Sequence, residues 1–168
     1  MHIYLICGQT GSGKTFYIEN ELLPEIILKK YDIFIFDVNN EYQIKNKYSF
    51  VGMDDFLEKV ENIKNSCIVF EEATAFFNNR GAAGQTLINL IVRKRHQNNI
   101  LVFVFHSLRQ IPVYVFDFCN YLILFRTNDR EDIVRNKFKF NDDIIRAYSF
   151  VKNMCKQRKY FKTIKKLY

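Results

Sequence analysis

The octapeptide Gly8–Thr15 constrains this chain more than any other stretch. It reads G-Q-T-G-S-G-K-T and matches the phosphate-binding P-loop pattern G-x-x-x-x-G-K-[ST]. The apolar run Ile3–Cys7 precedes it and predicts a strand, and a helix is expected from Lys14 onward. In this strand–loop–helix setting, successive backbone N–H groups and the helix N-terminus can hold a phosphate. The motif therefore predicts a nucleotide triphosphate site.

Every position of the motif has a part in the expected site. Lys14 would reach the β- and γ-phosphates, and the Thr15 hydroxyl would bind Mg²⁺. The residues expected to bind the cofactor are Gly8, Gln9, Thr10, Gly11, Ser12, Gly13, Lys14 and Thr15. The predicted cofactors are accordingly ATP and Mg²⁺.

A second informative stretch, Cys67–Glu72, is an apolar strand that ends in two carboxylates. In P-loop ATPases this is the Walker B position, where the first acid, here Glu71, holds Mg²⁺, usually through water. The second acid, Glu72, would activate the attacking water as a general base. The usual first acid is Asp, so Glu71 departs from the pattern. In the alternative reading, the pair is only the acidic first turn of the next helix.

Apolar strands alternate with helical segments along the chain, which predicts an α/β fold with a mostly parallel central sheet, as in the three-layer additional-strand P-loop NTPases. Two polar positions follow such strands. Asp37 comes after the run 33–36 and either contacts a ligand or caps the next turn. His106 follows the run 100–105. Its side chain either senses the γ-phosphate or forms its hydrogen bonds with the backbone.

Charge divides the chain at its C-terminal end. From residue 144 onward there are eight Lys or Arg and no acid, whereas the preceding residues hold seventeen basic and eighteen acidic side chains. We therefore expect an ATPase domain over 1–150 and a basic tail over 151–168 that contacts a polyanion, most simply DNA. The alternative is a basic end that is merely solvated.

The remaining composition excludes several classes. The four cysteines (Cys7, Cys67, Cys119 and Cys155) have neither metal-ligand nor disulfide spacing. No signal peptide is visible, and no apolar run reaches the roughly 20 residues that span a membrane. The expected location is cytoplasmic, in the host cell interior or associated with a virion.

The middle of the chain resembles the FtsK–HerA superfamily of DNA-pumping ATPases. Arg95 ends a helix just before a very apolar strand, His106-Ser107 ends that strand, and Pro112 follows. In its small size the chain is similar to the genome-packaging ATPases of membrane-containing viruses and phages, with the zonular-occludens-toxin-like ATPases of filamentous phages as related alternatives. One departure is that the glutamine expected at the strand tip is absent, and Gln110 lies a few residues beyond.

The resemblance implies a ring, a hexamer in this superfamily, with double-stranded DNA in its pore and ATP between subunits. Arg95 would be the arginine finger that reaches the neighbour's γ-phosphate, ahead of Arg80, Arg93 and Arg109. A viral capsid or membrane portal protein would be the docking partner. Two other hypotheses are a small-molecule P-loop kinase and a nucleotide-binding switch that does not hydrolyse ATP.

Overall fold

The computed structural model describes residues 2–45, 47–78, 81–158 and 162–167, with backbone alone at 82–83 and 94–95. Its strands are β1 (Ile3–Cys7), β2 (Asp32–Phe36), β3 (Lys47–Phe50), β4 (Ser66–Phe70), β5 (Ile100–Phe105), β6 (Tyr121–Phe125) and β7 (Lys162–Lys166). Its α-helices are α1 (Lys14–Tyr17), α2 (Leu23–Leu28), α3 (Met53–Val60), α4 (Ala73–Asn78), α5 (Ala82–Gln97), α6 (Glu131–Lys137) and α7 (Asp142–Met154). A π-helical segment, η1 (Ile18–Leu22), and two 3₁₀ helices, η2 (Leu108–Gln110) and η3 (Val113–Phe118), complete the elements.

The strands form one sheet in the order β3-β2-β4-β5-β1-β6-β7. Neighbouring strands run parallel from β3 to β5 and from β1 to β6, and β7 runs antiparallel to β6. Strand β5 therefore lies between the strand before the P-loop and the strand before Glu71-Glu72. This order is the additional-strand arrangement, so the predicted three-layer α/β fold is confirmed.

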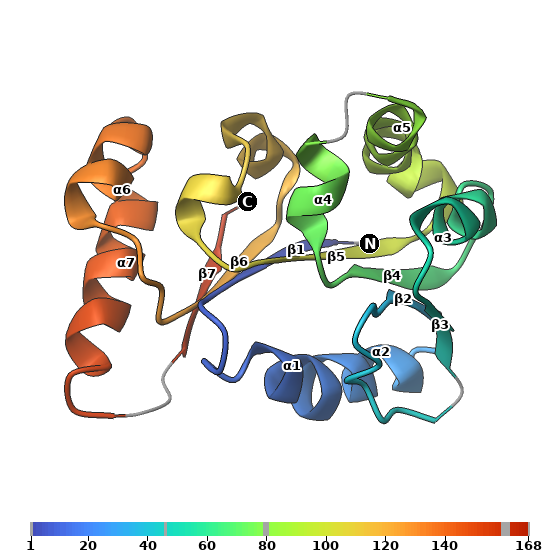
Figure 1. Ribbon diagram of the computed structural model, residues 1–168, viewed down its shortest axis with the longest axis horizontal. Helices are drawn as coiled ribbons and strands as arrows, with labels where there is room; N and C mark the ends of the chain where they lie inside the picture. Colours follow the sequence, from blue (N-terminus) through green and yellow to red (C-terminus); the bar gives the residue numbers. More distant parts are fainter. Residues whose placement is uncertain (1, 46, 79–80, 159–161, 168) are drawn as a thin grey trace. The chain divides into compact units, whose positions relative to one another are not determined.

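The chain divides into two compact units, and the first comprises residues up to Ile3 together with Thr15–Val104. Within it, α3, α4 and α5 cover one face of strands β2–β5, and α1 and α2 cover the other (Figure 1). All residues of β4 and β5 are buried. Their sequences are almost entirely apolar because a parallel strand between two helix layers has no solvent-exposed face.

A cluster of phenylalanines fixes the carboxyl ends of these strands. Phe36, Phe70 and Phe103 are neighbours across β2, β4 and β5. Phe76 of α4 packs edge-on against Phe36 and Phe70, with ring centroids 4.9 and 5.0 Å apart, and Phe56 of α3 packs against both. Burying each ring contributes about 1.5–3 kcal/mol. The turn that carries Glu71 and Glu72 therefore follows a strand end that is held in place by packed aromatic rings.

The helix expected from Lys14 onward is present but interrupted. It runs from α1 through the π-helical segment Ile18–Leu22 into α2, with Pro24 in the first turn of α2. Proline has no N–H and collides with the carbonyl one turn earlier, and the wider π turn accommodates it. The helix therefore changes from π to α geometry directly before Pro24.

The second unit comprises Tyr4–Lys14 and the residues from Phe105 onward. Residues expected to form a basic tail here belong to α7 and to β7, which pairs with all five residues of β6. The sequence did not predict β7, since Lys162–Lys166 has one large apolar residue, Ile164, which is 54% exposed. Lysines on an edge strand prevent it from pairing with other chains.

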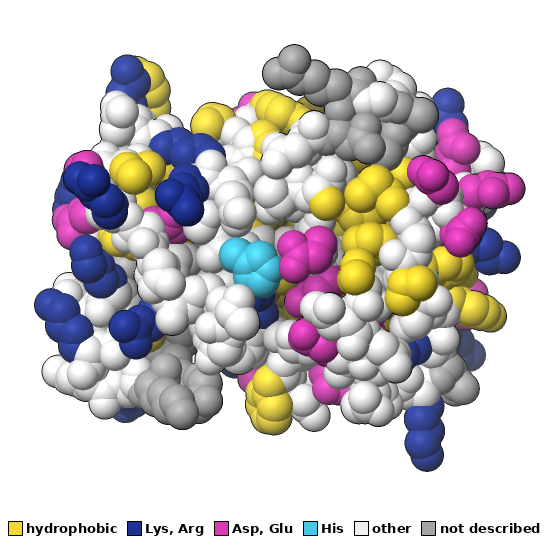
Figure 2. Space-filling view, in the orientation of Figure 1, with side chains coloured by type: hydrophobic (Ala, Val, Ile, Leu, Met, Phe, Trp, Pro, Cys, Tyr) yellow, Lys and Arg dark blue, Asp and Glu magenta, His cyan; other side chains and the backbone are white. Residues whose placement is uncertain are grey.

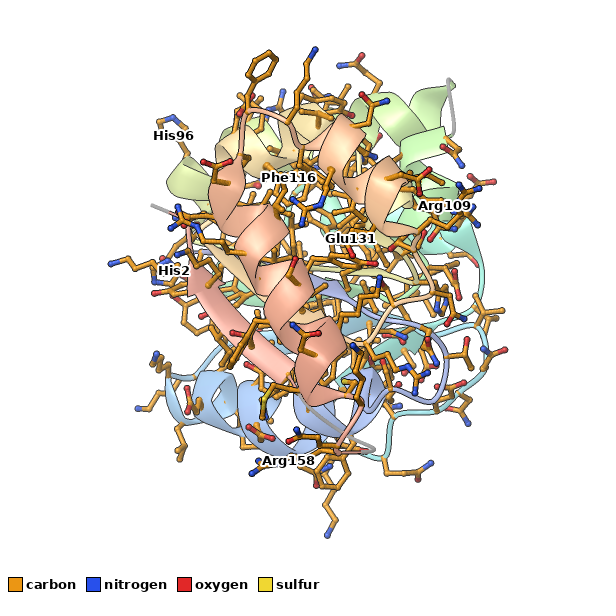
Figure 3. All side chains as sticks on the ribbon, turned by 90° about the vertical axis from the view of Figure 1, so that its left-hand side faces the viewer. His2, His96, Arg109, Phe116, Glu131 and Arg158 are labelled. Atoms are coloured by element: carbon orange, nitrogen blue, oxygen red, sulfur yellow. The ribbon has the colours of Figure 1, made fainter. Side chains whose placement is uncertain are left out.

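Lys and Arg side chains gather over α6 and α7 (Figure 2). Lys152 of α7 pairs with Glu131 of α6 at 3.2 Å, and Lys165 of β7 pairs with Asp143 of α7 at 2.9 Å. Figure 3 faces these helices and shows Glu131 on α6 and Arg158 beyond the C-terminal end of α7. The four cysteines are free thiols, and within the described ranges no helix is long and apolar enough to cross a membrane.

Candidate nucleotide-binding site

The P-loop is held at both neighbouring strands by its backbone. The Gly8 N–H donates to the carbonyl of Phe105 at 3.0 Å, and the Gln9 N–H donates to the carbonyl of Arg126 at 2.8 Å. Gly11 and Gly13 have φ angles of 73° and 96°, in the left-handed region that side chains disfavour. The sequence pattern therefore folds as a tight loop at the carboxyl ends of β1, β5 and β6.

Lys14 lies folded back over this loop. It is only 5% exposed, its Nζ donates to the Gln9 carbonyl at 3.3 Å, and it lies 3.5 Å from Nδ1 of His106. Nearby, the Ser12 hydroxyl and the Gln9 amide oxygen are buried and have no hydrogen-bond partner among the described residues. A buried ammonium group beside an unpaired hydroxyl fits a phosphate group, so these residues suit the triphosphate of ATP.

His106, the candidate sensor, lies at the end of β5 beside Lys14. No glutamine follows β5 directly, but the side chain of Gln110 folds back to the residue after His106. The Ser107 N–H donates a hydrogen bond to Oε1 of Gln110 at 3.1 Å. The buried Asp129 supports the same turn, because its Oδ2 accepts the Leu108 N–H at 2.7 Å. The sequence did not predict this contact of Asp129, although buried carboxylates in proteins are usually hydrogen-bonded.

Gly8 leaves no room for a side chain, which gives a testable prediction. A Cβ at this position would lie 2.6 Å from both Phe125 Cβ and Ser12 Oγ. We expect Gly8→Ala to cost about 1–3 kcal/mol of folding free energy, since the backbone must shift. The melting temperature should fall by about 2–4 °C for each of these kcal/mol, and the stabilisation by added nucleotide should weaken.

The matched control for Gly8→Ala is Gly52→Ala. A Cβ at Gly52 meets only the Asp55 side chain, with Oδ2 at 3.0 Å, and this flexible group can move. Thermal unfolding with and without ATP measures both variants. Equal melting temperatures for the two variants would contradict the steric role of Gly8.

Glu71 and Glu72 follow β4 in the first unit, and both are partly exposed. The Glu71 carboxylate accepts a hydrogen bond from the hydroxyl of Tyr42, and its N–H donates to the Phe36 carbonyl at 3.4 Å. Glu72 immediately precedes α4, and its carbonyl accepts the Ala75 N–H at 3.0 Å. The acids are thus at the carboxyl end of a buried strand, as the Walker B reading requires, and Glu72 also opens a helix.

The loop after β2 is built around Asp37. This carboxylate is 1% exposed and accepts the N–H groups of Glu41, at 2.9 Å, and Tyr42, at 3.2 Å. Lys47 lies 3.5 Å from it and also donates to the Tyr42 carbonyl. Of the two readings left open for Asp37, the structure bears out the turn cap.

This loop brings two residues that sequence reasoning did not single out to the candidate metal ligands. The Thr15 hydroxyl donates to Oε2 of Glu41 at 3.4 Å, and Tyr42 bonds to Glu71. Burial, and after it the Glu71 carboxylate, raises the pKa of Tyr42, so its phenol remains a donor. The only local signal was a polar segment of loop directly after a buried strand.

The donor set fits Mg²⁺. The described residues contain no group of three or more His, Cys, Asp or Glu arranged to hold a metal. Mg²⁺ bound with a nucleotide needs none, because it takes one or two protein oxygens together with phosphate oxygens and water. The oxygens of Thr15 and Glu71 are of the required hard type.

The arginine candidates differ in what the structure describes. Arg95 lies in the last turn of α5, and its side chain is outside the described residues, as is all of Arg80. Arg93 on α5 and Arg109 on η2 are exposed, and Figure 3 labels Arg109.

Residues 1–137 match the family described as "Helicase HerA, central domain". The chain belongs to the HerA central-domain family. This membership confirms the resemblance to the FtsK–HerA superfamily, and the match includes the P-loop, Glu71-Glu72, Arg95 and His106. No curated protein matches the chain.

Solved structures share the fold of this HerA-family chain. The genome-packaging NTPase B204 from Sulfolobus turreted icosahedral virus 2, in complex with AMPPCP, aligns with a TM-score of 0.77 at 17% identity, covering 99% of this chain and 92% of that one. The same protein in complex with ATP-gammaS gives 0.76 at 18% identity, with the same shares covered. The ATPase EssC from Geobacillus thermodenitrificans gives 0.58 at 12% identity, covering 76% of this chain and 32% of that one.

Proposed function

We propose that this protein is an ATP-hydrolysing motor that translocates DNA, specifically a viral or phage genome-packaging ATPase. The observation that carries the proposal is that a HerA-family chain with a complete P-loop shares its fold, over nearly its whole length, with a viral genome-packaging NTPase. The nearest alternative function is that of a filamentous-phage assembly ATPase, which would use the same nucleotide chemistry as a packaging ATPase.

In the proposed mechanism, the P-loop backbone holds the triphosphate and Lys14 donates to the β- and γ-phosphates. Thr15 and Glu71 would hold Mg²⁺, which when bound would neutralise negative charge on the triphosphate. Glu72 accepts a proton from the attacking water as it approaches the γ-phosphorus. His106, beside Lys14, is proposed to sense whether the γ-phosphate is present.

Assembly completes the site in this proposal. Subunits form a ring, a hexamer by the superfamily pattern, and Arg95 of one subunit reaches the nucleotide of the next. Double-stranded DNA occupies the pore and contacts basic residues of the C-terminal segment 151–168, and a capsid or membrane portal protein anchors the ring. The protein is proposed to act in the cytoplasm of the host or on the virion.

Phosphate release with and without double-stranded DNA tests the proposal. We expect DNA to stimulate ATP turnover, and the stimulation to fall as salt rises, because basic side chains release counterions from DNA when they bind. A rate of ATP turnover that is the same with and without DNA, together with phosphorylation of an added nucleoside, would support a kinase instead. Nucleotide binding without turnover in either condition would support the non-hydrolysing switch.

The role of the C-terminal segment in DNA binding needs substitutions, because truncation would remove β7 from the sheet. A Lys162→Ala/Lys166→Ala variant is expected to reduce the salt dependence of DNA binding by up to about one unit of slope for each phosphate that it no longer binds. Lys29→Ala/Lys30→Ala, two exposed lysines after α2, is the matched control. An unchanged salt slope in the first variant would exclude these lysines from DNA binding.

A further inference from the structure

The loop between β2 and β3 contacts both residues proposed to hold Mg²⁺. Two consecutive residues do this: Glu41 accepts a hydrogen bond from the Thr15 hydroxyl at 3.4 Å, and Tyr42 donates one to the Glu71 carboxylate. Thr15 and Glu71 are far apart in sequence, and this loop forms a hydrogen bond to each of them. Neither loop residue belongs to the P-loop or to the Glu71-Glu72 pair.

The loop is built to hold these side chains in place. Tyr42 is 1% exposed, so its ring is fixed by packing before its hydroxyl reaches Glu71. The buried Asp37 binds the N–H groups of both Glu41 and Tyr42, and Lys47 ties Asp37 to the Tyr42 carbonyl. On the other side, Glu19 accepts the Gln43 N–H at 2.5 Å and attaches the loop to the helix that follows the P-loop.

Glu71 needs such support more than an aspartate would. Its side chain has one more rotatable bond than Asp, and holding a glutamate in one geometry costs up to about 1.5–2 kcal/mol of side-chain entropy. A donor from a rigid, buried tyrosine removes much of that freedom before any ligand arrives. Removing partners of this kind around metal ligands typically changes metal affinity by about 10–100-fold.

We propose that Tyr42 is a positioning residue for the magnesium site: it holds Glu71, while Glu41 on the same loop holds Thr15. The inference rests on the proposed function, in which Thr15 and Glu71 bind Mg²⁺. Tyr42 itself does not touch the metal or the nucleotide. Its effect passes through the geometry of Glu71.

Binding of a fluorescent ATP analogue, titrated with Mg²⁺ from EDTA-treated protein, tests this without measuring turnover. We expect Tyr42→Phe to raise the Mg²⁺ concentration at the midpoint by about tenfold. The affinity for the analogue in EDTA should stay unchanged. The control is Tyr48→Phe, which removes a hydroxyl from a tyrosine that is 52% exposed and stacks on Phe34 in the same unit.

A double-mutant cycle separates positioning from a purely structural role. If Tyr42 acts through Glu71, Tyr42→Phe should have no further effect in a Glu71→Ala background, because alanine has no oxygen to accept the Tyr42 hydrogen bond. Midpoints equal to the wild type for Tyr42→Phe, or a shift that persists with Glu71→Ala, would each overturn the proposal. A wild-type protein whose nucleotide affinity ignores Mg²⁺ would overturn instead the metal site on which the proposal rests.

Discussion

Replacing Glu72 with glutamine is expected to leave ATP binding intact and to slow ATP turnover by about 10²–10⁴-fold. The amide has the size of the carboxylate but cannot take a proton from water. Glu72 lies at the end of a fully buried strand, on a turn supported by the phenylalanine cluster, so the substitution should not disturb the fold. Steady-state phosphate release and equilibrium binding of ATP measure the two effects separately.

Glu58→Gln is the matched control for Glu72→Gln, because it makes the same chemical change at an exposed position on α3 of the same unit. It should leave both turnover and binding as in the wild type. Residual turnover of Glu72→Gln within a few-fold of the wild type would exclude Glu72 as the general base. Loss of ATP binding would show that its role is structural, at the start of α4.

Replacing Arg95 with alanine is expected to slow turnover by about 10³–10⁵-fold, the range measured for arginine fingers in related phosphoryl transfer. The charge acts on the transition state in a neighbouring subunit, so ATP binding by the isolated subunit should change little. Arg93→Ala, an exposed arginine two residues earlier on α5, is the control and should retain turnover.

Mixing two inactive variants decides whether the finger acts between subunits. An Arg95→Ala subunit keeps Glu72, and a Glu72→Gln subunit keeps Arg95, so a mixed ring contains interfaces with both groups. Turnover should therefore reappear on mixing, in proportion to the fraction of mixed interfaces. Mixtures that assemble but stay inactive would contradict action in trans, and full activity of Arg95→Ala alone would remove Arg95 from catalysis.

The P-loop and the buried strands β4 and β5 were predictable because their signals are local. A P-loop needs particular residue types at fixed spacing, and Gly11 and Gly13 do adopt the positive φ angles that the pattern requires. Strands β4 and β5 were predictable because a strand buried on both faces is apolar throughout. The family match then bears out the wider resemblance.

Other features depend on contacts between distant residues. Gln110 lies beyond the end of β5 in the sequence, but its side chain accepts a hydrogen bond from the Ser107 N–H beside the strand end. The π-helical turn before Pro24 depends on how a whole helix accommodates one ring. No periodicity in the sequence encodes either arrangement.

By itself, the sequence determined that a P-loop follows β1 and that two acids end an apolar strand, because a motif with fixed spacing and an unbroken apolar run are both local signals. Only the tertiary structure decided that Asp37 is a turn cap, that Lys162–Lys166 joins the sheet, and that Tyr42 holds Glu71. Each of these contacts depends on how the folded chain brings its segments together. Their energy comes from hydrogen bonds formed where folding excludes water, and no local pattern carries that information.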